Sequence, residues 1–404
     1  MQKYRFLREA LPVPVKKSGK DGKTGIVMIT GARQTGKTTL AKLVFPGLKY
    51  INLDSPENRE AVRAVPSAMW GRDVGNAVID EAQKETVVFD KVKFAYDERD
   101  ISFCVLLGSS QILLLKKIRE SLAGRVAIYE LWPLLMSELP TDAAKRPEKP
   151  LLDRILSVKK PENILKRERS VLMGKEDSLR LDAEKYLLNW GGMPALLPLE
   201  EEERWKWLKD YEYTYLERDL ADLARLDDLE PFRKFQRLSA LRSACLLSYS
   251  ELSRDASVSV DTARRYLEYL RLSYQVILLQ PYFRNITSSV VKTPKLYWLD
   301  IGLMRQLSGF KGEASGGIYE TMVVGEIHKW IKTAQKDTEM YFYRTRSGLE
   351  LDLMLKTRDG IIGIEIKARA NTAASDLRAL KEVARGLGKE WLGGMVVYQG
   401  NTIK

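Results

Sequence analysis

A chain of 404 residues is too long for a single hydrophobic core, so its length predicts about two to four domains. Hydrophobic residues make up 45% of the chain and charged residues 30%, a composition that excludes a disordered or a membrane-spanning protein. Cys104 and Cys245 are the only cysteines and form no CxxC pattern, which argues against a disulfide framework and a structural zinc site. We find neither a signal-peptide pattern nor an apolar stretch of bilayer length, and therefore expect a cytoplasmic protein without a membrane partner.

The net charge of +12 is concentrated in one part of the chain. Residues 233–305 contain twelve Lys and Arg against five Asp and Glu. Such a surface attracts polyanions such as nucleic acid, although it also occurs on proteins that have no such partner. We expect the contact surface for a partner to lie in this segment.

The hydrophobic patterns divide the chain into four parts. Short β-branched runs alternate with helical patterns over residues 1–140, which predicts an α/β fold with a parallel sheet and crossover helices. A polar, proline-rich stretch then opens residues 141–230, which have helical patterns only and are expected to form a helical lid. Residues 231–308 give two helices and then two strands, the order of a winged helix-turn-helix, and residues 309–404 return to a helix followed by strands.

A phosphate-binding loop is predicted near the start of the first part. The stretch GARQTGKT, residues 31–38, matches GxxxxGK[ST] and lies between an apolar strand pattern and a helix pattern, the context that this motif requires. Glycines let successive backbone N–H groups and the helix N-terminus face phosphate oxygens, while Lys37 reaches the β- and γ-phosphates. We therefore expect ATP to be bound by Gly31, Ala32, Arg33, Gln34, Thr35, Gly36, Lys37, Thr38 and Thr39.

Three further positions complete the predicted hydrolytic site. The apolar strand AVIDE ends in Asp80, which is expected to hold Mg²⁺ together with Thr38, and in Glu81, which is expected to polarise the attacking water. Ser110 follows the apolar run LLGSS at a place where a polar side chain can sense the γ-phosphate. Arg125 lies between a helix pattern and the next strand, where a guanidinium can stabilise charge on a phosphate of a neighbouring subunit.

These motifs together resemble the AAA+ ATPases, in particular the bacterial and archaeal branch that carries a winged helix and a C-terminal nuclease-like domain. The resemblance implies that Arg125 is an arginine finger and that the protein is a homo-oligomer. The stretch GGMPAL resembles the GxP motif in the lid of signalling NTPases related to AAA+, which implies that Pro194 lies close to the nucleotide. The commoner AAA+ lid has an arginine at this point, so Arg218 is the remaining candidate for that sensor.

The basic segment predicts a helix, a short turn through residues 257–259 and a second helix capped by Ser259 or Asp261. On the second helix, apolar residues share one face and three arginines lie on the outer faces. These arginines can contact DNA, although winged helices also contact proteins: Arg264, Arg265 and Arg271.

The last part contains the pattern of a hairpin that turns near residue 359. Leu351, Leu353 and Leu355 are expected to share one core face with isoleucines of the second strand. Depending on the turn, Asp352 lies opposite Glu365 or opposite Lys367.

The spacing of Asp352, Glu365 and Lys367 resembles the PD-(D/E)XK nucleases. The resemblance implies an α/β restriction-endonuclease-like domain in which Glu320, with Glu326 as its rival, completes a site for a second Mg²⁺ or Mn²⁺. His328, the only histidine, lies within a helix pattern and is interpreted as structural.

Three functions remain open at this point. The preferred one is a Mg²⁺-dependent ATPase coupled to DNA binding or remodelling. The alternatives are a regulatory NTPase switch with a non-catalytic C-terminal scaffold and an ATP-gated, metal-dependent DNA nuclease.

Overall fold

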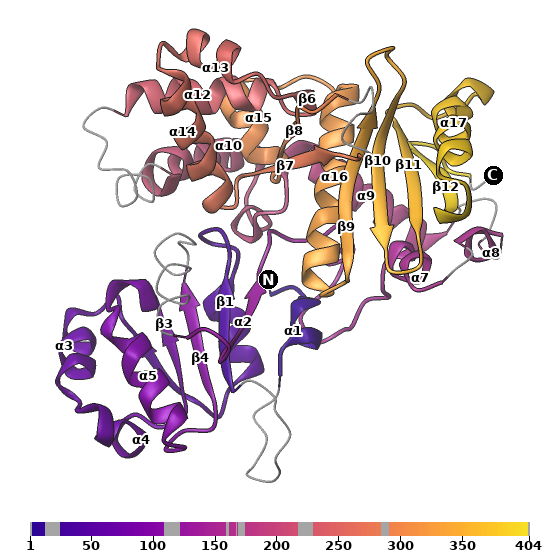
Figure 1. The fold of residues 1–404 in the computed structure, drawn as a ribbon. Helices are drawn as coiled ribbons and strands as arrows, with labels where there is room; N and C mark the ends of the chain where they lie inside the picture. Colours follow the sequence, from indigo (N-terminus) through magenta and orange to yellow (C-terminus); the bar gives the residue numbers. More distant parts are fainter. Residues whose placement is uncertain are drawn as a thin grey trace.

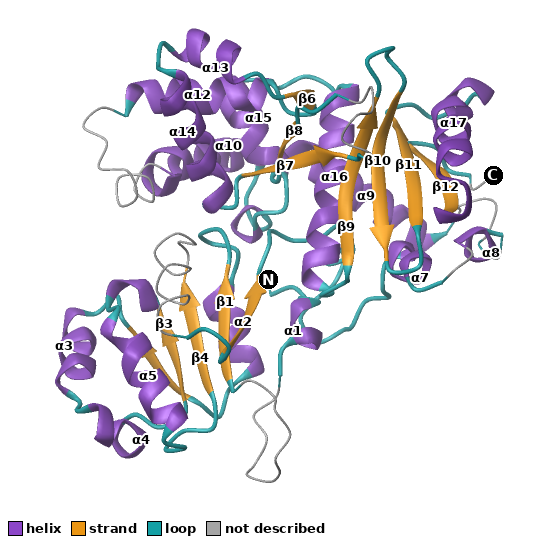
Figure 2. Ribbon diagram, viewed as in Figure 1, coloured by secondary structure: helices purple, strands orange, loops and turns teal. Residues whose placement is uncertain are grey.

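The computed structural model describes residues 2–12, 25–108, 122–158, 161–166, 168, 174–216, 229–283 and 291–402. Within them, the chain forms two β-sheets in separate parts of the molecule, with helices around both (Figure 1). The first sheet is built from the amino-terminal residues, and the second from residues of the carboxyl-terminal half (Figure 2).

The first sheet has five parallel strands in the order β2-β3-β4-β1-β5. β1, β3 and β4 are buried on both faces, because helices cover both sides of the sheet. The parallel order predicted for residues 1–140 is therefore present. The strands are β1 (Ile26–Thr30), β2 (Lys49–Asn52), β3 (Ala77–Asp80), β4 (Cys104–Gly108) and β5 (Val126–Glu130).

Alternate residues along β1 enter the two cores. Ile26 and Met28 pack with Trp70 and Phe89 on one face, whereas Val27 and the residues in phase with it pack with α2 on the other. The helices of this part are α1 (Leu7–Ala10), α2 (Lys37–Val44), α3 (Pro56–Ala64), α4 (Trp70–Asp73) and α5 (Val87–Asp97).

The next residues are mainly helical and connect the two sheets. They form α7 (Leu151–Leu156), α8 (Pro161–Leu165), α9 (Lys175–Trp190) and α10 (Glu201–Tyr211). Short 3₁₀ and π turns are η1 (Ser67–Met69), η2 (Ala82–Lys84), η3 (Pro194–Leu196), η4 (Glu212–Leu216), η5 (Ala374–Leu377) and η6 (Gly388–Glu390).

A helix-turn-helix follows. Ser259 caps the second helix, since its Oγ accepts a hydrogen bond of 3.1 Å from the backbone N–H of Thr262, and Ser257 supplies the left-handed turn with φ +58°. The elements here are α12 (Glu230–Leu241), β6 (Cys245–Leu246), α13 (Tyr249–Ala256), α14 (Val260–Leu272), β7 (Val276–Pro281), β8 (Lys295–Trp298) and α15 (Ile301–Ser308). β8 pairs antiparallel with both β7 and β6.

The second sheet crosses the boundary predicted at residue 308. Its seven strands have the order β12-β11-β10-β9-β7-β8-β6, with β7 and β9 paired in parallel through Gln280 and Tyr341. α16 covers one face and α17 the other (Figure 1). The remaining elements are α16 (Gly316–Thr333), β9 (Thr338–Arg344), β10 (Glu350–Thr357), β11 (Ile361–Lys367), α17 (Arg378–Leu387) and β12 (Trp391–Tyr398).

The prediction that three leucines of β10 share one face is wrong for Leu351. Leu353 and Leu355 pack into the core beneath α16, but Leu351 packs with Leu380 of α17 on the other face. The pairing of β10 with β9 shifts register between Leu351 and Met354, and such a bulge reverses the alternation of side chains along a strand.

Candidate functional site

The loop after β1 has the backbone shape that its glycines allow. Gly31 has φ +148°, and a Cβ there would lie 2.1 Å from the carbonyl oxygen of Leu131. Gly36 has φ +94° and precedes α2 directly. Gln34 also has a positive φ, of 60°, so the loop is curled along its length. Its position, at the carboxyl end of a parallel strand and at a helix N-terminus, is where α/β proteins bind phosphates.

Lys37 is buried and lies over this loop. Its Nζ donates hydrogen bonds of 2.9 Å to the carbonyl of Gly31 and 2.8 Å to that of Ala32. The ammonium is thus held by weak, neutral acceptors. Phosphate oxygens are stronger acceptors for a cation, so they can draw the ammonium away from these carbonyls.

Thr38 and Asp80, the two residues predicted to hold Mg²⁺, lie next to each other. The Thr38 hydroxyl lies 2.6 Å from Oδ2 of Asp80, and the hydroxyl of Tyr50 donates to the same oxygen at 2.7 Å. A hydroxyl beside a carboxylate is a set of hard oxygen donors that suits Mg²⁺. Burial and the hydrogen bond to Asp80 raise the pKa of Tyr50 above its usual range. Sequence reasoning missed Tyr50, which lies on β2 in no motif.

Glu81 has the unusual backbone conformation φ 54°, ψ 41°, directly after β3. Its N–H donates to Oδ1 of Asp80 at 2.9 Å, and its Oε2 accepts a hydrogen bond of 2.5 Å from the side-chain amide of Gln83. The carboxylate is therefore at the site but engaged by its own chain. A carboxylate has acceptor sites on both oxygens, so the bond from Gln83 orients Glu81 but does not prevent it from accepting a proton from water.

Two more side chains hold the loop from distant parts of the chain. Nη1 of Arg5 donates to the carbonyl of Thr35 at 2.7 Å, and its Nε lies 3.1 Å from Oε2 of the fully buried Glu138. Burial raises the pKa of Glu138, and the guanidinium of Arg5 opposes that shift. Tyr211, at the end of α10, donates to the carbonyl of Arg33 at 3.2 Å. Arg5 and Tyr211 belong to no motif, so sequence reasoning missed both.

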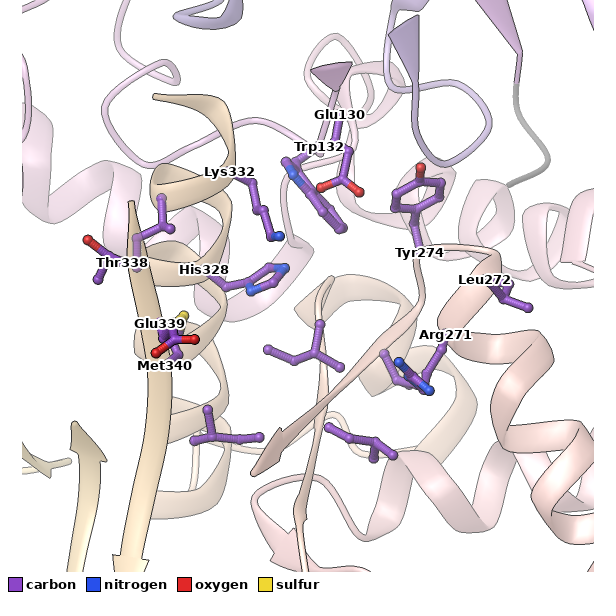
Figure 3. A pocket seen from close by; sticks show the side chains of 15 residues that line it. Glu130, Trp132, Arg271, Leu272, Tyr274, His328, Lys332, Thr338, Glu339 and Met340 are labelled. Atoms are coloured by element: carbon purple, nitrogen blue, oxygen red, sulfur yellow. The ribbon is translucent and has the colours of Figure 1, made fainter. Parts of the chain in front are cut away.

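A cavity of about 410 Å³ lies next to this loop, between the first sheet, α14 and α16 (Figure 3). The rings of Trp132 and Tyr274 meet edge to face at 5.1 Å on its wall, and the Tyr274 hydroxyl lies 3.0 Å from Oγ1 of Thr30, the residue before the loop. Glu130 and Lys332 also line the cavity. Burial raises the pKa of Glu130, and the positive charge of Lys332 opposes that shift.

Arg125 lies at the amino-terminal end of the strands, whereas the loop lies at their carboxyl end. It precedes Val126, which pairs with Ile26 at the start of β1, whereas the loop follows the other end of β1, about 13 Å farther along. Its Nε forms an exposed ion pair of 2.6 Å with Asp97. Arg125 therefore does not reach the loop of its own subunit.

Three other predictions concern the surroundings of the nucleotide. Ser110 and Arg218 lie outside the described residues. Pro194 begins η3, and the glycines before it make close contacts: the N–H of Gly192 donates to the buried Asp300 at 2.8 Å. A Cβ at Gly191 would lie 2.2 Å from Oδ1 of Asp300, so this motif is explained by packing. A role of Pro194 at the nucleotide stays a prediction.

The three arginines of α14 do not share one environment. Arg264 and Arg265 are exposed, with hydrogen bonds of 3.3 Å to Asp261 and Thr262 on their own helix. Arg271 pairs with Glu268 at 2.6 Å and lines the cavity of Figure 3. All three side chains are exposed, so a DNA contact by these arginines stays a prediction.

The acidic residues of the last part lie near one another around β10 and β11. Leu353 pairs with Ile364, a register that sets Asp352 opposite Glu365 when it is extended by one residue. Oδ2 of Asp352 accepts a hydrogen bond of 2.8 Å from the N–H of Ile366. Burial, together with the charges of Glu320 and Glu365, raises the pKa of Asp352 to about 7.

These carboxylates do not form a metal site. In the described part of the chain, no group of three or more His, Cys, Asp or Glu side chains is arranged to hold a metal ion. Lys367 lies 2.6 Å from Glu365 and 3.9 Å from Asp352, and Lys295 bonds to Glu320. Glu326, the rival of Glu320, instead accepts from the N–H of Met136 at 2.7 Å.

One family match covers the residues of the predicted nucleotide site. Residues 23–140, which contain the loop, Asp80 and Glu81, match a family model described as an AAA domain. This part of the chain is therefore similar to AAA-type ATPase domains. Residues 181–314 and 315–404 match two models described as domains of unknown function, DUF8612 and DUF4143. Among the described helices, none has the length and apolar character needed to cross a membrane.

Similar proteins extend over most of the chain. The uncharacterized protein Rv2008c of Mycobacterium tuberculosis is 28% identical over 359 residues, which is 87% of this chain and 72% of that protein. The uncharacterized protein MJ1544 of Methanocaldococcus jannaschii is 24% identical over 353 residues, 82% of this chain and 72% of that protein. Among solved structures, a Walker-type ATPase of Pyrococcus abyssi has a TM-score of 0.38 at 15% identity, covering 70% of this chain and 91% of that one.

Proposed function

We propose that this protein is a Mg²⁺-dependent ATPase whose turnover is coupled to DNA binding or remodelling by its helix-turn-helix. The observation that carries the ATPase proposal is the meeting of Thr38 and Asp80 at 2.6 Å beside a curled phosphate-binding loop. Thr38 and Asp80 would hold Mg²⁺, which when bound supplies positive charge to the β- and γ-phosphates.

The remaining residues of the site have separate roles in hydrolysis. Lys37 leaves the carbonyls of Gly31 and Ala32 for phosphate oxygens. Glu81, oriented by Gln83, accepts a proton from the water that attacks the γ-phosphate. Each of these steps uses a group that already lies at the carboxyl edge of the sheet.

The DNA proposal depends on α14 and on its connection to the nucleotide site. Arg264 and Arg265 are exposed on this helix. Tyr274, two residues after the helix ends, bonds to Thr30 next to the loop. Binding of DNA to α14 can therefore alter the nucleotide site.

A regulatory nucleotide switch is the second candidate function. The hydrogen bond of 2.5 Å between Gln83 and Glu81 favours it, because a donor on one oxygen leaves the base fewer acceptor sites for the attacking water, which slows hydrolysis and prolongs the ATP-bound state. The two functions differ in rate: an ATPase turns over repeatedly, whereas a switch hydrolyses its ATP slowly and needs a trigger.

Two substitutions test the ATPase proposal. We expect Lys37→Ala to lose nucleotide binding, measured with a fluorescent ATP analogue, because it removes the phosphate-binding cation. Glu81→Gln should bind ATP normally but hydrolyse it at least ~10²-fold more slowly, since the amide cannot accept a proton. The exposed Glu98→Gln serves as the control. Normal turnover by Glu81→Gln would remove Glu81 from the role of base.

The homo-oligomer proposal rests on Arg125, which is too far from its own loop to act there. If Arg125 acts on a neighbouring subunit, mixing inactive Arg125→Ala with inactive Glu81→Gln should restore turnover, because some interfaces then combine an intact arginine with an intact base. Absence of rescue in verified mixed assemblies would leave Arg125 as the surface partner of Asp97.

A further inference from the structure

Lys295 is a buried cation placed among acidic side chains of another part of the chain. Its side chain is only 4% exposed, its Nζ lies 3.0 Å from Oε1 of Glu320, and it forms a second ion pair with Glu350. The hydroxyl of Tyr297 donates to the same oxygen of Glu320 at 2.6 Å. Lysine is almost never buried to this degree unless it is paired, so these carboxylates are what hold it there.

The other acidic residues near it are also neutralised by the chain itself. Arg344 pairs with Glu350 at 2.9 Å. Lys367 lies between Glu365 and Asp352, and Asp352 accepts the N–H of Ile366. A divalent cation would have to displace these donors. It would above all have to displace Lys295, whose positive charge already lies beside the Glu320 carboxylate.

Lys295 lies outside residues 309–404, the part of the chain that resembles a nuclease. It lies on β8 and pairs with Leu279 of β7, and β7 in turn pairs with β9. Glu320 is on α16 and Glu350 is on β10. The ion pairs of Lys295 therefore join residues on both sides of the predicted boundary at residue 308, within one continuous sheet.

We propose that Lys295 is an internal cation that takes the place of a metal ion between Glu320 and Glu350, in the cluster that also contains Asp352, and that it makes residues 309–404 a scaffold joined to the helix-turn-helix. The inference concerns this cluster alone, so its failure would leave the proposed ATPase intact. It also accounts for a nuclease-like spacing of acidic residues without a metal site: the same charges stabilise the junction.

Binding of Mn²⁺ without nucleotide tests the proposal. All variants carry Asp80→Asn, so that the ATPase site does not contribute, and Mn²⁺ binding to the full chain is measured by electron paramagnetic resonance. The parent should bind no Mn²⁺ at micromolar concentrations. Lys295→Met, which keeps the length of the side chain but removes its charge, should bind at least ~10-fold more tightly, and adding Asp352→Asn should abolish this binding.

Lys356→Met is the matched control, since Lys356 pairs with Glu339 at an exposed position on the same sheet. It should behave as the parent does. Stoichiometric micromolar binding by the parent that is lost on Asp352→Asn would overturn the proposal, as would a folded Lys295→Met that gains no affinity.

Thermal unfolding covers the case in which Lys295→Met does not fold. Removing one charge from a buried pair is strongly destabilising because the other charge stays unpaired. Lys295→Met combined with Glu320→Gln should then recover much of the thermal midpoint that the single variant loses. A double variant no more stable than the single one would contradict charge compensation as the role of Lys295.

Discussion

Asp80 receives three donors from its own chain: the hydroxyls of Thr38 and Tyr50 on Oδ2, and the N–H of Glu81 on Oδ1. A carboxylate held this way has a fixed orientation. Groups that orient a metal-binding carboxylate affect metal affinity and activity although they do not touch the metal. Tyr50 is such a group.

Tyr50→Phe removes one of these donors and keeps the ring. We expect the Mg²⁺ concentration for half-maximal ATP turnover to rise about 10-fold or more, because Asp80 loses part of its orientation. Turnover is measured across a Mg²⁺ titration, with Tyr129→Phe on β5 as the control. An unchanged Mg²⁺ requirement would show that Thr38 and Glu81 orient Asp80 without help.

His328 lines the cavity between the first sheet, α14 and α16. Its ring meets Trp132 edge to face at 5.2 Å, and burial, with Lys332 and Lys329 nearby, lowers its pKa to about 3. The folded protein therefore binds fewer protons than the unfolded chain between about pH 3 and 6.5. The neutral imidazole contributes stability above pH 6.5 that is lost as the pH falls through this window.

Because His328 is the only histidine, its ring gives a single set of NMR signals. We expect these signals to show a neutral imidazole from pH 8 down to pH 5, with no titration step near 6.5. His328→Gln, which cannot become protonated, should reduce the loss of thermal stability between pH 6.5 and 5. A titration midpoint near 6.5 in the folded protein would mean that the ring is open to water.

At the scale of the element, α14 faces both the solvent and the cavity of Figure 3. Tyr266 and Leu270 are buried in the core, Arg264, Arg265 and Arg271 are exposed, and Arg271 also lines the cavity. A helix placed in this way can contact a duplex with its outer face while the residues at its end contact the predicted ATPase domain. The two outer arginines and Arg271 should therefore differ in their effect on DNA binding.

We expect the Arg264→Ala, Arg265→Ala double variant to lower the slope of log affinity against log salt by about two for duplex DNA, one for each phosphate that is no longer neutralised. Arg271→Ala, at the end of the helix beside the cavity, is compared with it and should lower the slope by less. Affinities measured by fluorescence anisotropy at several salt concentrations give the slopes. Equal effects of the two variants would argue for diffuse attraction, and no effect of either would favour a protein partner for α14.

At the scale of the whole molecule, separate parts of the chain converge on the phosphate-binding loop. Arg5 holds Thr35 from the amino terminus, Tyr211 reaches Arg33 from α10, and Tyr274 bonds to Thr30 from the end of α14. Trp132, Tyr274 and Leu299 also pack with Ala32 of the loop. Movement of α10 or of α14 would therefore alter contacts at this loop.

Tyr274→Phe breaks one such contact and preserves the packing of the ring. We expect DNA affinity to be unchanged, but the ratio of ATP turnover with and without DNA should move toward one by about threefold or more, since coupling between sites is typically worth about 1–3 kcal/mol. Tyr269→Phe, elsewhere on α14, is the control. A full DNA effect in Tyr274→Phe would place the coupling in Arg5 or Tyr211.

The sequence by itself determined the features that depend on short stretches of chain. The loop at residues 31–38, the acids Asp80 and Glu81 and the parallel strands follow from local spacing and hydrophobic period. The cap of α14 was narrowed to Ser259 or Asp261, and the structure has Ser259. The sequence left Asp352 opposite either Glu365 or Lys367 in the hairpin. The structure sets it opposite Glu365. These features are local because propensity, capping and turn chemistry act over a few residues.

Only the tertiary structure decided which distant residues meet. Tyr50 reaches Asp80 across 30 residues of chain, Tyr211 reaches Arg33 across 178, and Tyr274 reaches Thr30 across 244. The same is true of Lys295, which pairs with Glu320 and Glu350 where the sequence resembles a nuclease site. Such contacts have no period or motif in the sequence, because they arise when separately formed elements pack and a buried charge must find its partner.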